Sequence, residues 1–159
     1  KLSSQFACFQ KLGKAYLAST GGFQNELSFV PNQISKISKL EELDLSQNEI
    51  SEISNIPKKL RVLKVCSNRI SRVYLPKLKN LHTLELSDNR LISLEGLSEL
   101  KSLRYLYLDS NFVETLKSLS GLKLLELDIS YNNIKRSEIL REVVSQVCVL
   151  KVSGNPFYK

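Results

Sequence analysis

The sequence predicts an α/β solenoid, a curved right-handed coil of about seven stacked turns. Three observations predict it: the nine-residue phrase Leu-x-x-Leu-x-Leu-x-x-Asn recurs along the chain, most of its copies are 20 to 23 residues apart, and an apolar residue lies two positions after each asparagine. Such a pattern, with a period of about 20 to 29 residues, is typical of repeat proteins. We expect a parallel sheet on the concave side and short helices and 3₁₀ turns on the convex side.

The second half of the phrase recurs seven times, with successive asparagines 16 to 23 residues apart. The copies span residues 27–34, 43–50, 63–70, 84–91, 106–113, 127–134 and 150–157. Alternation of the paired leucines predicts a short strand with one buried face. The asparagine follows this strand, where its side-chain amide bonds backbone groups that no neighbouring strand reaches. Equivalent side chains are therefore expected to stack from turn to turn.

The segments between the strands predict a helical or 3₁₀ return path. Ile50 and Ile53 are three residues apart, and the later copies repeat this spacing, which suits short helical turns. Residues 137–146 carry a fuller helical pattern, with Ser137 in the position of an N-cap. Because one turn cannot bury its apolar edge alone, neighbouring turns must stabilise one another.

The first residues of the chain differ from the repeats. Five apolar side chains recur there at three- to four-residue steps: Leu2, Phe6, Phe9, Leu12 and Tyr16. This spacing predicts an amphipathic helix that ends near Gly21 and Gly22, and a disordered leader is the alternative. We therefore divide the chain into an N-terminal helical lid, residues 1–22, and a repeat region, residues 23–159, which ends at the start of a C-terminal cap.

The repeated phrases resemble those of the leucine-rich-repeat family over roughly residues 24–157. They are most similar to its subclass of about 22 residues per repeat, which includes a protein-phosphatase-1 regulatory subunit, tubulin-folding cofactor E and an axonemal dynein light chain. The resemblance implies a solenoid and a habit of binding other proteins. It does not imply a particular partner, because one fold serves many functions.

Strand residues that flank the buried leucines are expected on the concave face. They comprise eight carboxylates and two amines, a formal charge of −6: Glu26, Glu42, Asp44, Glu85, Asp88, Asp109, Glu126 and Asp128, with Lys64 and Lys151. Three tyrosines join them: Tyr105, Tyr107 and Tyr131. We predict that this face binds a basic helix or peptide, since carboxylates steer the encounter and tyrosines supply binding energy. The alternative is that these side chains only keep the face soluble.

A basic flank competes with this interpretation in a chain of net charge +7. Its cations lie within residues 58–79, which contain no acid: Lys58, Lys59, Arg61, Arg69, Arg72, Lys77 and Lys79. Such a patch suits an acidic partner such as RNA, tubulin tails or an anionic membrane. A solvated patch without a role is the other possibility.

The sequence offers little for catalysis. It has a single histidine, His82, and neither a Cys-x-x-Cys nor a Gly-x-Ser-x-Gly motif, so we predict no enzyme activity, no metal and no cofactor. Cys8, Cys66 and Cys148 form no close pair, which favours a reducing, intracellular compartment: cytoplasm, cytoskeleton or cilium, or nucleus. We expect a monomeric module within a larger scaffold or regulatory protein.

Overall fold

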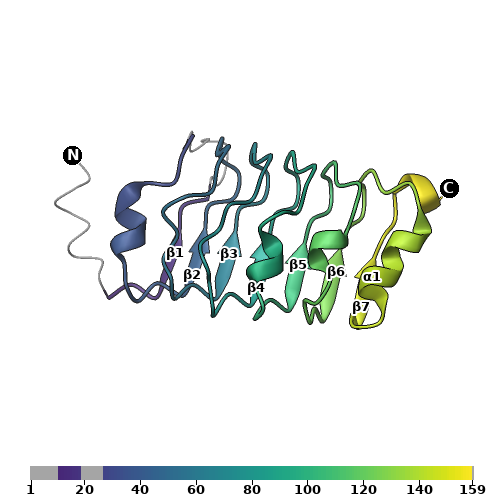
Figure 1. Cartoon of the computed structure of the whole chain (residues 1–159). Coiled ribbons are helices and arrows are strands. Elements are labelled where there is room, and N and C mark those ends of the chain that lie inside the picture. Colours follow the sequence, from purple (N-terminus) through teal and green to yellow (C-terminus); the bar gives the residue numbers. More distant parts are fainter. Residues whose placement is uncertain (1–10, 19–26, 159) are drawn as a thin grey trace.

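The computed structural model describes residues 11–18 and 27–158, which form an elongated stack of turns (Figure 1). One parallel sheet contains seven strands in chain order. The strands are β1 Lys14–Tyr16, β2 Glu42–Asp44, β3 Val62–Lys64, β4 Thr83–Glu85, β5 Tyr105–Tyr107, β6 Glu126–Asp128 and β7 Val149–Lys151. The predicted solenoid with a parallel sheet and 3₁₀ turns is confirmed.

The strands form because their leucines alternate with polar residues. In β2 to β6 the central residue is buried and its two neighbours are half-buried. The register aligns Leu43 with Leu63 and Leu63 with Leu84, and the same column continues through the later strands. Each column of leucines is thereby removed from water, which supplies the main driving force for stacking the turns.

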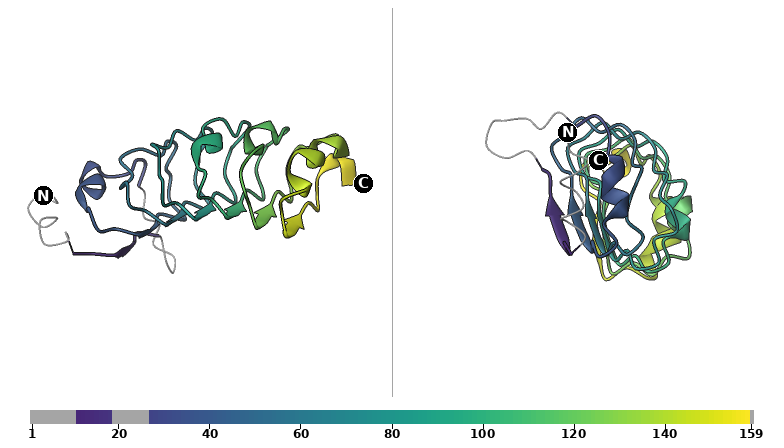
Figure 2. Two further views of the ribbon diagram at one scale, coloured as in Figure 1. Left: turned by 60° about the horizontal axis from the view of Figure 1, so that its bottom comes forward. Right: turned by 90° about the vertical axis from the view of Figure 1, so that its left-hand side faces the viewer.

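The return segments lie on the side of the coil opposite the strands (Figure 2). Their helical turns are η2 Asn32–Lys36, η3 Leu97–Glu99, η4 Lys117–Leu119, η5 Ser137–Leu140, α1 Arg141–Val144 and η6 Pro156–Tyr158. Residues 137–144 are thus helical as predicted, but Ser137 lies inside η5, whose N-cap is Arg136. Leu97, Leu100 and other aliphatic residues of these segments close the core from this side.

Six buried asparagines form a ladder along the stack: Asn48, Asn68, Asn89, Asn111, Asn132 and Asn155. Asn68 is representative. Its Nδ2 donates to the carbonyls of Val65 in its own turn and Leu45 in the preceding turn, at 3.1 and 3.0 Å. Its Oδ1 accepts from the Ile50 amide at 2.9 Å. Each amide therefore satisfies backbone groups of two consecutive turns, which explains why the repeat requires asparagine.

The structure corrects the start of the repeat region. Residues 14–16, which the apolar spacing placed in an N-terminal helix, form β1 and pair with β2. The Gly13 carbonyl accepts from the amides of Glu41 and Glu42 at 2.8 and 3.1 Å. A sheet edge has a row of unpaired backbone groups, and pairing with it outweighs a weak local helical pattern. The rest of the predicted lid lies largely outside the described residues.

The phrase at residues 27–34 is not a strand. The Leu27 amide donates to Asn48 Oδ1, as the Ile50 amide donates to Asn68 Oδ1. Leu27 therefore takes the place of the aliphatic residue after the asparagine, and Asn32 is exposed at the start of η2, outside the ladder. The spacing of 16 residues between Asn32 and Asn48 was the sign that this copy is out of phase with the others.

Candidate functional site

The outward side chains of the sheet, which we call the strand face, form two rows across all seven strands. The first row contains the first residue of each strand: Lys14, Glu42, Val62, Thr83, Tyr105, Glu126 and Val149. The second contains the third residue: Tyr16, Asp44, Lys64, Glu85, Tyr107, Asp128 and Lys151. The structure thus brings nine of the predicted concave residues onto one surface.

Two tyrosines of β5 occupy the middle of the strand face. Tyr105 and Tyr107 line an open hollow of about 530 Å³ together with Thr83, Glu85 and Ser87. The ring of His82 lies against Tyr105, with 5.0 Å between their centroids. Partial burial, followed in effect by the charge of Glu126, raises the pKa of Tyr107, so this phenol stays neutral at physiological pH.

Lysines within the strand face neutralise several of its carboxylates. Lys14 Nζ lies 2.7 Å from Glu42 Oε2, and Lys64 Nζ lies 3.1 Å from Glu85 Oε1. The hydrogen bond to Glu42 raises the pKa of Lys14, and the same bond is the main cause that lowers the pKa of Glu42. These contacts are partly open to water, so their main effect is on orientation and specificity.

Lys151 makes the corresponding contacts on the C-terminal half. Its Nζ lies 3.2 Å from Glu126 and 3.6 Å from Asp128, and the hydrogen bond to Glu126 is the main cause that raises the pKa of Lys151. The same nitrogen lies 5.9 Å from the centroid of the Tyr107 ring. A lysine of this protein thus already contacts both a carboxylate and a tyrosine of the central site.

The remaining carboxylates have no cation within ion-pair distance among the described residues. Asp44 accepts from the Ser46 amide at 2.9 Å, and Asp109 accepts from the Ser87 hydroxyl. Within the described strand face and the turn just after it, seven carboxylates face three lysines, which leaves a formal charge of −4. Glu26, an eighth predicted acid, lies outside the described residues.

Asp88 and Tyr131 lie at the rim of this surface. Both directly precede a ladder asparagine and adopt left-handed φ values of 54° and 52°, beyond the ends of β4 and β6. Both are exposed. The sequence analysis grouped both residues with the outward side chains of the strands. The alternation of inward and outward side chains ends with the strand, however, so the two residues lie beside the strand face.

Lys14 and Tyr16 belong to the strand face, and the sequence analysis missed them. Tyr16 donates its hydroxyl to Glu42 Oε1 at 3.2 Å, so β1 adds an aromatic ring and an amine beside the predicted acids. The signal that identifies them is the alternation of Ala15 and Leu17, which pack against the core, with exposed Lys14 and Tyr16.

The thiol of Cys66 lies at the edge of the strand face, 3.9 Å from Glu85 Oε2. Burial, followed by the charge of Glu85, raises the pKa of this thiol to about 11. The thiolate is the reactive form of cysteine, so this environment makes Cys66 a poor nucleophile near neutral pH.

The structure separates the predicted basic flank into two parts. Lys58, Lys59 and Lys79 lie in the turns that precede β3 and β4. The prediction of one patch of seven cations is corrected here, because Arg69 and Arg72 lie after β3, apart from the other five. Arg69 follows the asparagine turn, where it pairs with Glu49, and Arg72 lies in the return segment. The two groups separate because each turn carries the chain from one edge of the sheet to the other.

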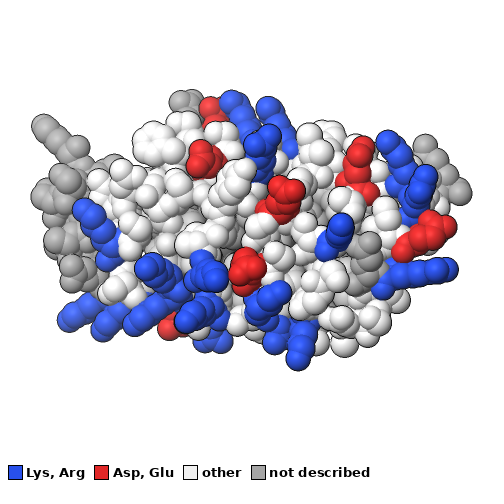
Figure 3. Space-filling model, in the orientation of Figure 1, with Lys and Arg blue, Asp and Glu red and all other residues white. Residues whose placement is uncertain are grey.

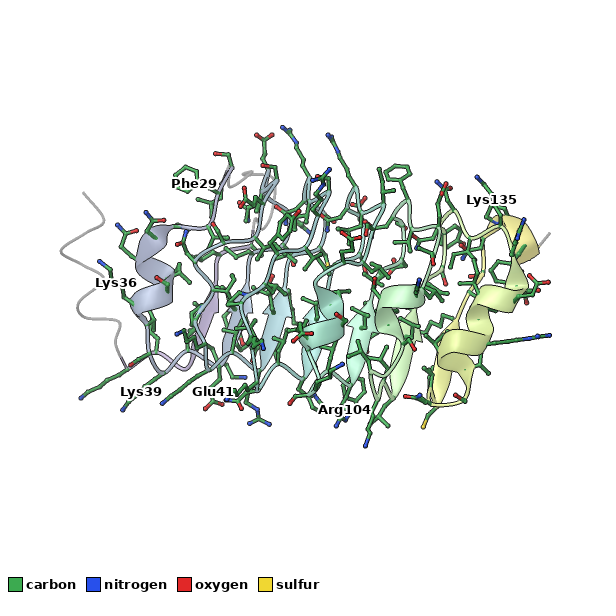
Figure 4. The ribbon with its side chains drawn as sticks, viewed as in Figure 1. Phe29, Lys36, Lys39, Glu41, Arg104 and Lys135 are labelled. Carbon is green, nitrogen blue, oxygen red and sulfur yellow. The ribbon has the colours of Figure 1, made fainter. Side chains whose placement is uncertain are left out.

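Cations from other turns extend the first part. We call the segments 38–41, 58–61, 77–82, 99–104 and 121–125 the basic edge. They contain two carboxylates, Glu41 and Glu99, and nine cations: Lys39, Lys58, Lys59, Arg61, Lys77, Lys79, Lys101, Arg104 and Lys123. Lysine and arginine side chains follow this edge in Figure 3, and Figure 4 shows Lys39 and Arg104 on the same edge of the molecule.

Two features that the described residues lack bear on other functions. No helix there is long and apolar enough to cross a bilayer. No group of three histidine, cysteine or acidic side chains in the same part of the chain has an arrangement suited to a metal ion.

Comparison with known proteins places the repeats in a family. Family profiles match residues 79–123, described as "Leucine Rich repeats (2 copies)", and residues 39–58 and 122–135, described as single leucine-rich repeats. The U2 small nuclear ribonucleoprotein A' of Arabidopsis thaliana is 35% identical over 78 residues, which cover 44% of this chain and 30% of the plant protein.

Solved structures share the fold. The internalins inlF and inlC2 of Listeria monocytogenes superpose with TM-scores of 0.75 and 0.78, each at 22% sequence identity. Each match covers 94% of this chain, and 50% and 65% of the respective internalin. The chain therefore spans less than two thirds of the length of each of these three proteins.

The stacked strands, the asparagine ladder and the matching profiles define this chain as a leucine-rich-repeat protein. Such domains are in general protein-interaction modules and are typically non-catalytic. The plant ribonucleoprotein subunit is a distant homologue. The subclass of about 22 residues per repeat stays a prediction.

Proposed function

We propose that this chain is a non-catalytic interaction module that binds a basic helix or peptide on the strand face. The observation that carries the proposal is the central hollow, in which Tyr105 and Tyr107 lie beside Glu85 and pair in register with Glu126 and Asp128. Tyrosine gives a large contact area at a low cost in conformational entropy, and the surrounding carboxylates favour a cation.

The intramolecular contacts of Lys151 support this choice of partner. Its amine lies close to Glu126, Asp128 and the Tyr107 ring, so the surface already accommodates a primary amine with carboxylates and a π-face together. A lysine or arginine of a partner would contact groups of the same kind in the neighbouring hollow, where the tyrosine rings lie near Asp109 and Glu85. Because carboxylates outnumber lysines on this face, the encounter is favoured by charge.

The dimensions also suit a short helix. Seven strands spaced about 4.8 Å apart span roughly 29 Å, and a helix of about 18 residues is about 27 Å long. A peptide of that length would cross the whole strand face, with its middle over β4 and the tyrosines of the neighbouring β5.

A binding assay with tyrosine variants tests the proposal. The probe is a fluorescently labelled amphipathic helical peptide of about 18 residues, rich in lysine and leucine. We expect the Tyr105→Ala, Tyr107→Ala double variant to weaken binding by about 30-fold or more, because the loss of even one buried aromatic anchor costs about 2 kcal/mol. Fluorescence anisotropy measures the change.

Tyr74→Ala is the matched control, since Tyr74 is an exposed tyrosine of the return segment beside Arg72 and Glu95. Its affinity for the peptide should equal that of the unmodified protein. Equal loss of affinity in the control and the double variant, or no loss in either, would contradict a binding site on the strand face.

The wider setting belongs to the same proposal. We place the chain inside the cell, as a monomeric part of a scaffold or regulatory protein. The support is the spread of its cysteines, of which Cys66 and Cys148 are free thiols, and its distant homologue, whose name places that protein in a nuclear ribonucleoprotein. Labelling of its lysines with a reagent that cannot cross membranes tests this location. We expect labelling only after the cells are lysed, and labelling of the protein in intact cells would contradict it.

A further inference from the structure

The basic edge lies beside the strand face and takes no part in the proposed peptide site. Its backbone is a continuous column: the amides of Arg61, His82, Arg104 and Leu125 donate to the carbonyls of Glu41, Arg61, His82 and Arg104 at 2.7 to 2.9 Å. The Ser102 hydroxyl bonds the Lys79 carbonyl and joins two corner turns. The cations of the edge therefore project from backbone that is hydrogen-bonded continuously from turn to turn.

Most of these cations are free to meet an anion. Among the described residues, the basic edge has two ion pairs, Arg61 with Glu41 and Lys77 with Glu99, both at 3.7 Å between exposed side chains. Arg104 Nη1 donates to the Lys101 and Leu103 carbonyls at 3.2 and 2.8 Å. These bonds fix its position and leave other guanidinium donors available.

The charge on the edge is dense and linear. From Lys39 to Lys123 the edge crosses five turns, a length of roughly 19 Å at about 4.8 Å per turn. Nine cations and two carboxylates over that length leave a net charge of +7, about one charge per 3 Å. A nucleic-acid duplex carries about one negative charge per 1.7 Å of axis. The density of positive charge along the edge is thus of the same order as the density of negative charge along a duplex.

We propose that the basic edge binds the phosphate backbone of a nucleic-acid duplex without reading its sequence. Lysine predominates on the edge, and lysine acts on phosphate as a point charge, which positions a duplex but carries no base information. His82, which lies in the basic edge, packs against Tyr105 with its ring tilted by 48°, and Tyr105 lies next to Glu126 in register. Bases are therefore not drawn onto these rings, which favours a duplex over a single strand.

The geometry favours a duplex over a membrane surface. A membrane is a plane, and it would be touched by one row of cations, with Leu125 as the sole exposed large apolar side chain within the five segments of the edge. A phosphate backbone follows a line and meets the row along its length.

A salt titration with charge-neutralised protein tests the proposal. The edge variant carries Lys59→Gln, Arg61→Gln, Lys79→Gln and Arg104→Gln. The matched control removes four cations outside the basic edge: Arg69→Gln, Arg90→Gln, Lys135→Gln and Arg136→Gln. The probes are RNA and DNA duplexes of about 20 base pairs in two unrelated sequences, and circular dichroism verifies that both variants are folded.

We expect the unmodified protein and the control to bind the duplexes alike, with little dependence on sequence. The edge variant should bind at least about tenfold more weakly at low salt, and the slope of log K against log salt should fall by about one for each lost phosphate contact. The edge variant and the control should bind the basic peptide equally well, because both have lost four cations outside the strand face, and this result separates the basic edge from the peptide site.

Three results would overturn the proposal. The first is equal weakening in the edge variant and the control, which would mean that only net charge matters. The second is tighter binding to phosphatidylserine vesicles or to polyglutamate than to duplexes. The third is no measurable duplex binding at low salt by the unmodified protein.

Discussion

The residue just before each ladder asparagine adopts a left-handed backbone. It is Gln47, Ser67, Asp88, Ser110 or Tyr131 in successive turns, with φ from 52° to 57°, and Gly154 in the last turn, with φ of 73°. Glycine is needed in the last turn for a second reason, since a Cβ at Gly154 would lie 2.4 Å from the Tyr131 ring. The conformation is a property of the turn, and the residue that adopts it is otherwise variable.

Cys66 gives a prediction about reactivity at this scale. In protein with Cys8→Ser and Cys148→Ser, the alkylation rate of Cys66 by iodoacetamide should keep rising to about pH 11, because its thiol pKa is raised to about 11 from the ordinary value of 9.0. Glu85→Gln should lower the midpoint only in part, since burial is the larger cause. A rate that levels off near pH 9 would contradict this environment.

At the scale of the element, the asparagine ladder links the backbone of each turn to that of the next. Asn89 bonds four backbone groups: its Oδ1 accepts from the Ile70 amide, and its Nδ2 donates to the carbonyls of Val65, Leu86 and Ser87. A buried backbone group without a partner costs about 1 to 3 kcal/mol. We expect Asn89→Ala to lower the free energy of unfolding by about 3 kcal/mol in urea titrations.

Asn32→Ala is the control for this prediction. Asn32 is exposed and lies outside the ladder, although its Oδ1 accepts a hydrogen bond from Asn55. Substitutions at such surface positions usually change stability by less than about 0.5 kcal/mol. Similar losses in the two variants would contradict the distinction between ladder and surface asparagines.

The first turn shows how far element prediction from sequence extends. Its strand lacks the leucine-and-asparagine phrase, and Ala15 takes the place of the central leucine. The phrase at residues 27–34 matches the repeat better than residues 14–16 do. The Leu27 amide nevertheless bonds Asn48 of the next turn, so Leu27 lies where the other turns have the aliphatic residue after the asparagine. Six of the seven strands followed from the repeated phrase, whereas the first strand depended on which backbone groups the edge of β2 left unpaired.

At the scale of the whole molecule, each strand bonds only its neighbours in the chain. Leu84 is fully buried and aligns with Leu63 and Leu106, so Leu84→Ala should destabilise the protein by about 2 to 5 kcal/mol. Because the stack is one-dimensional, we expect the largest acceleration of amide hydrogen exchange in β3 to β5 and the smallest in β1 and β7.

Ile92→Ala is the control for this substitution, because Ile92 is 62% exposed and its truncation leaves no internal cavity. Its exchange pattern should match that of the unmodified protein. If Leu84→Ala accelerates exchange evenly from β1 to β7, the turns do not behave as a chain of neighbouring units.

The sequence by itself determined the solenoid, the asparagine ladder and the surface on which Glu85, Tyr105 and Tyr107 lie, because a repeat of fixed period stacks equivalent positions. Only the tertiary structure decided that β1 completes the sheet and that Lys14 and Lys151 pair with its acids. It also separated Arg69 from the basic edge and joined Lys39 and Lys123 to it. The physical reason is that periodicity fixes which face a residue occupies within a turn, whereas contacts between turns depend on side-chain reach and on unpaired backbone groups.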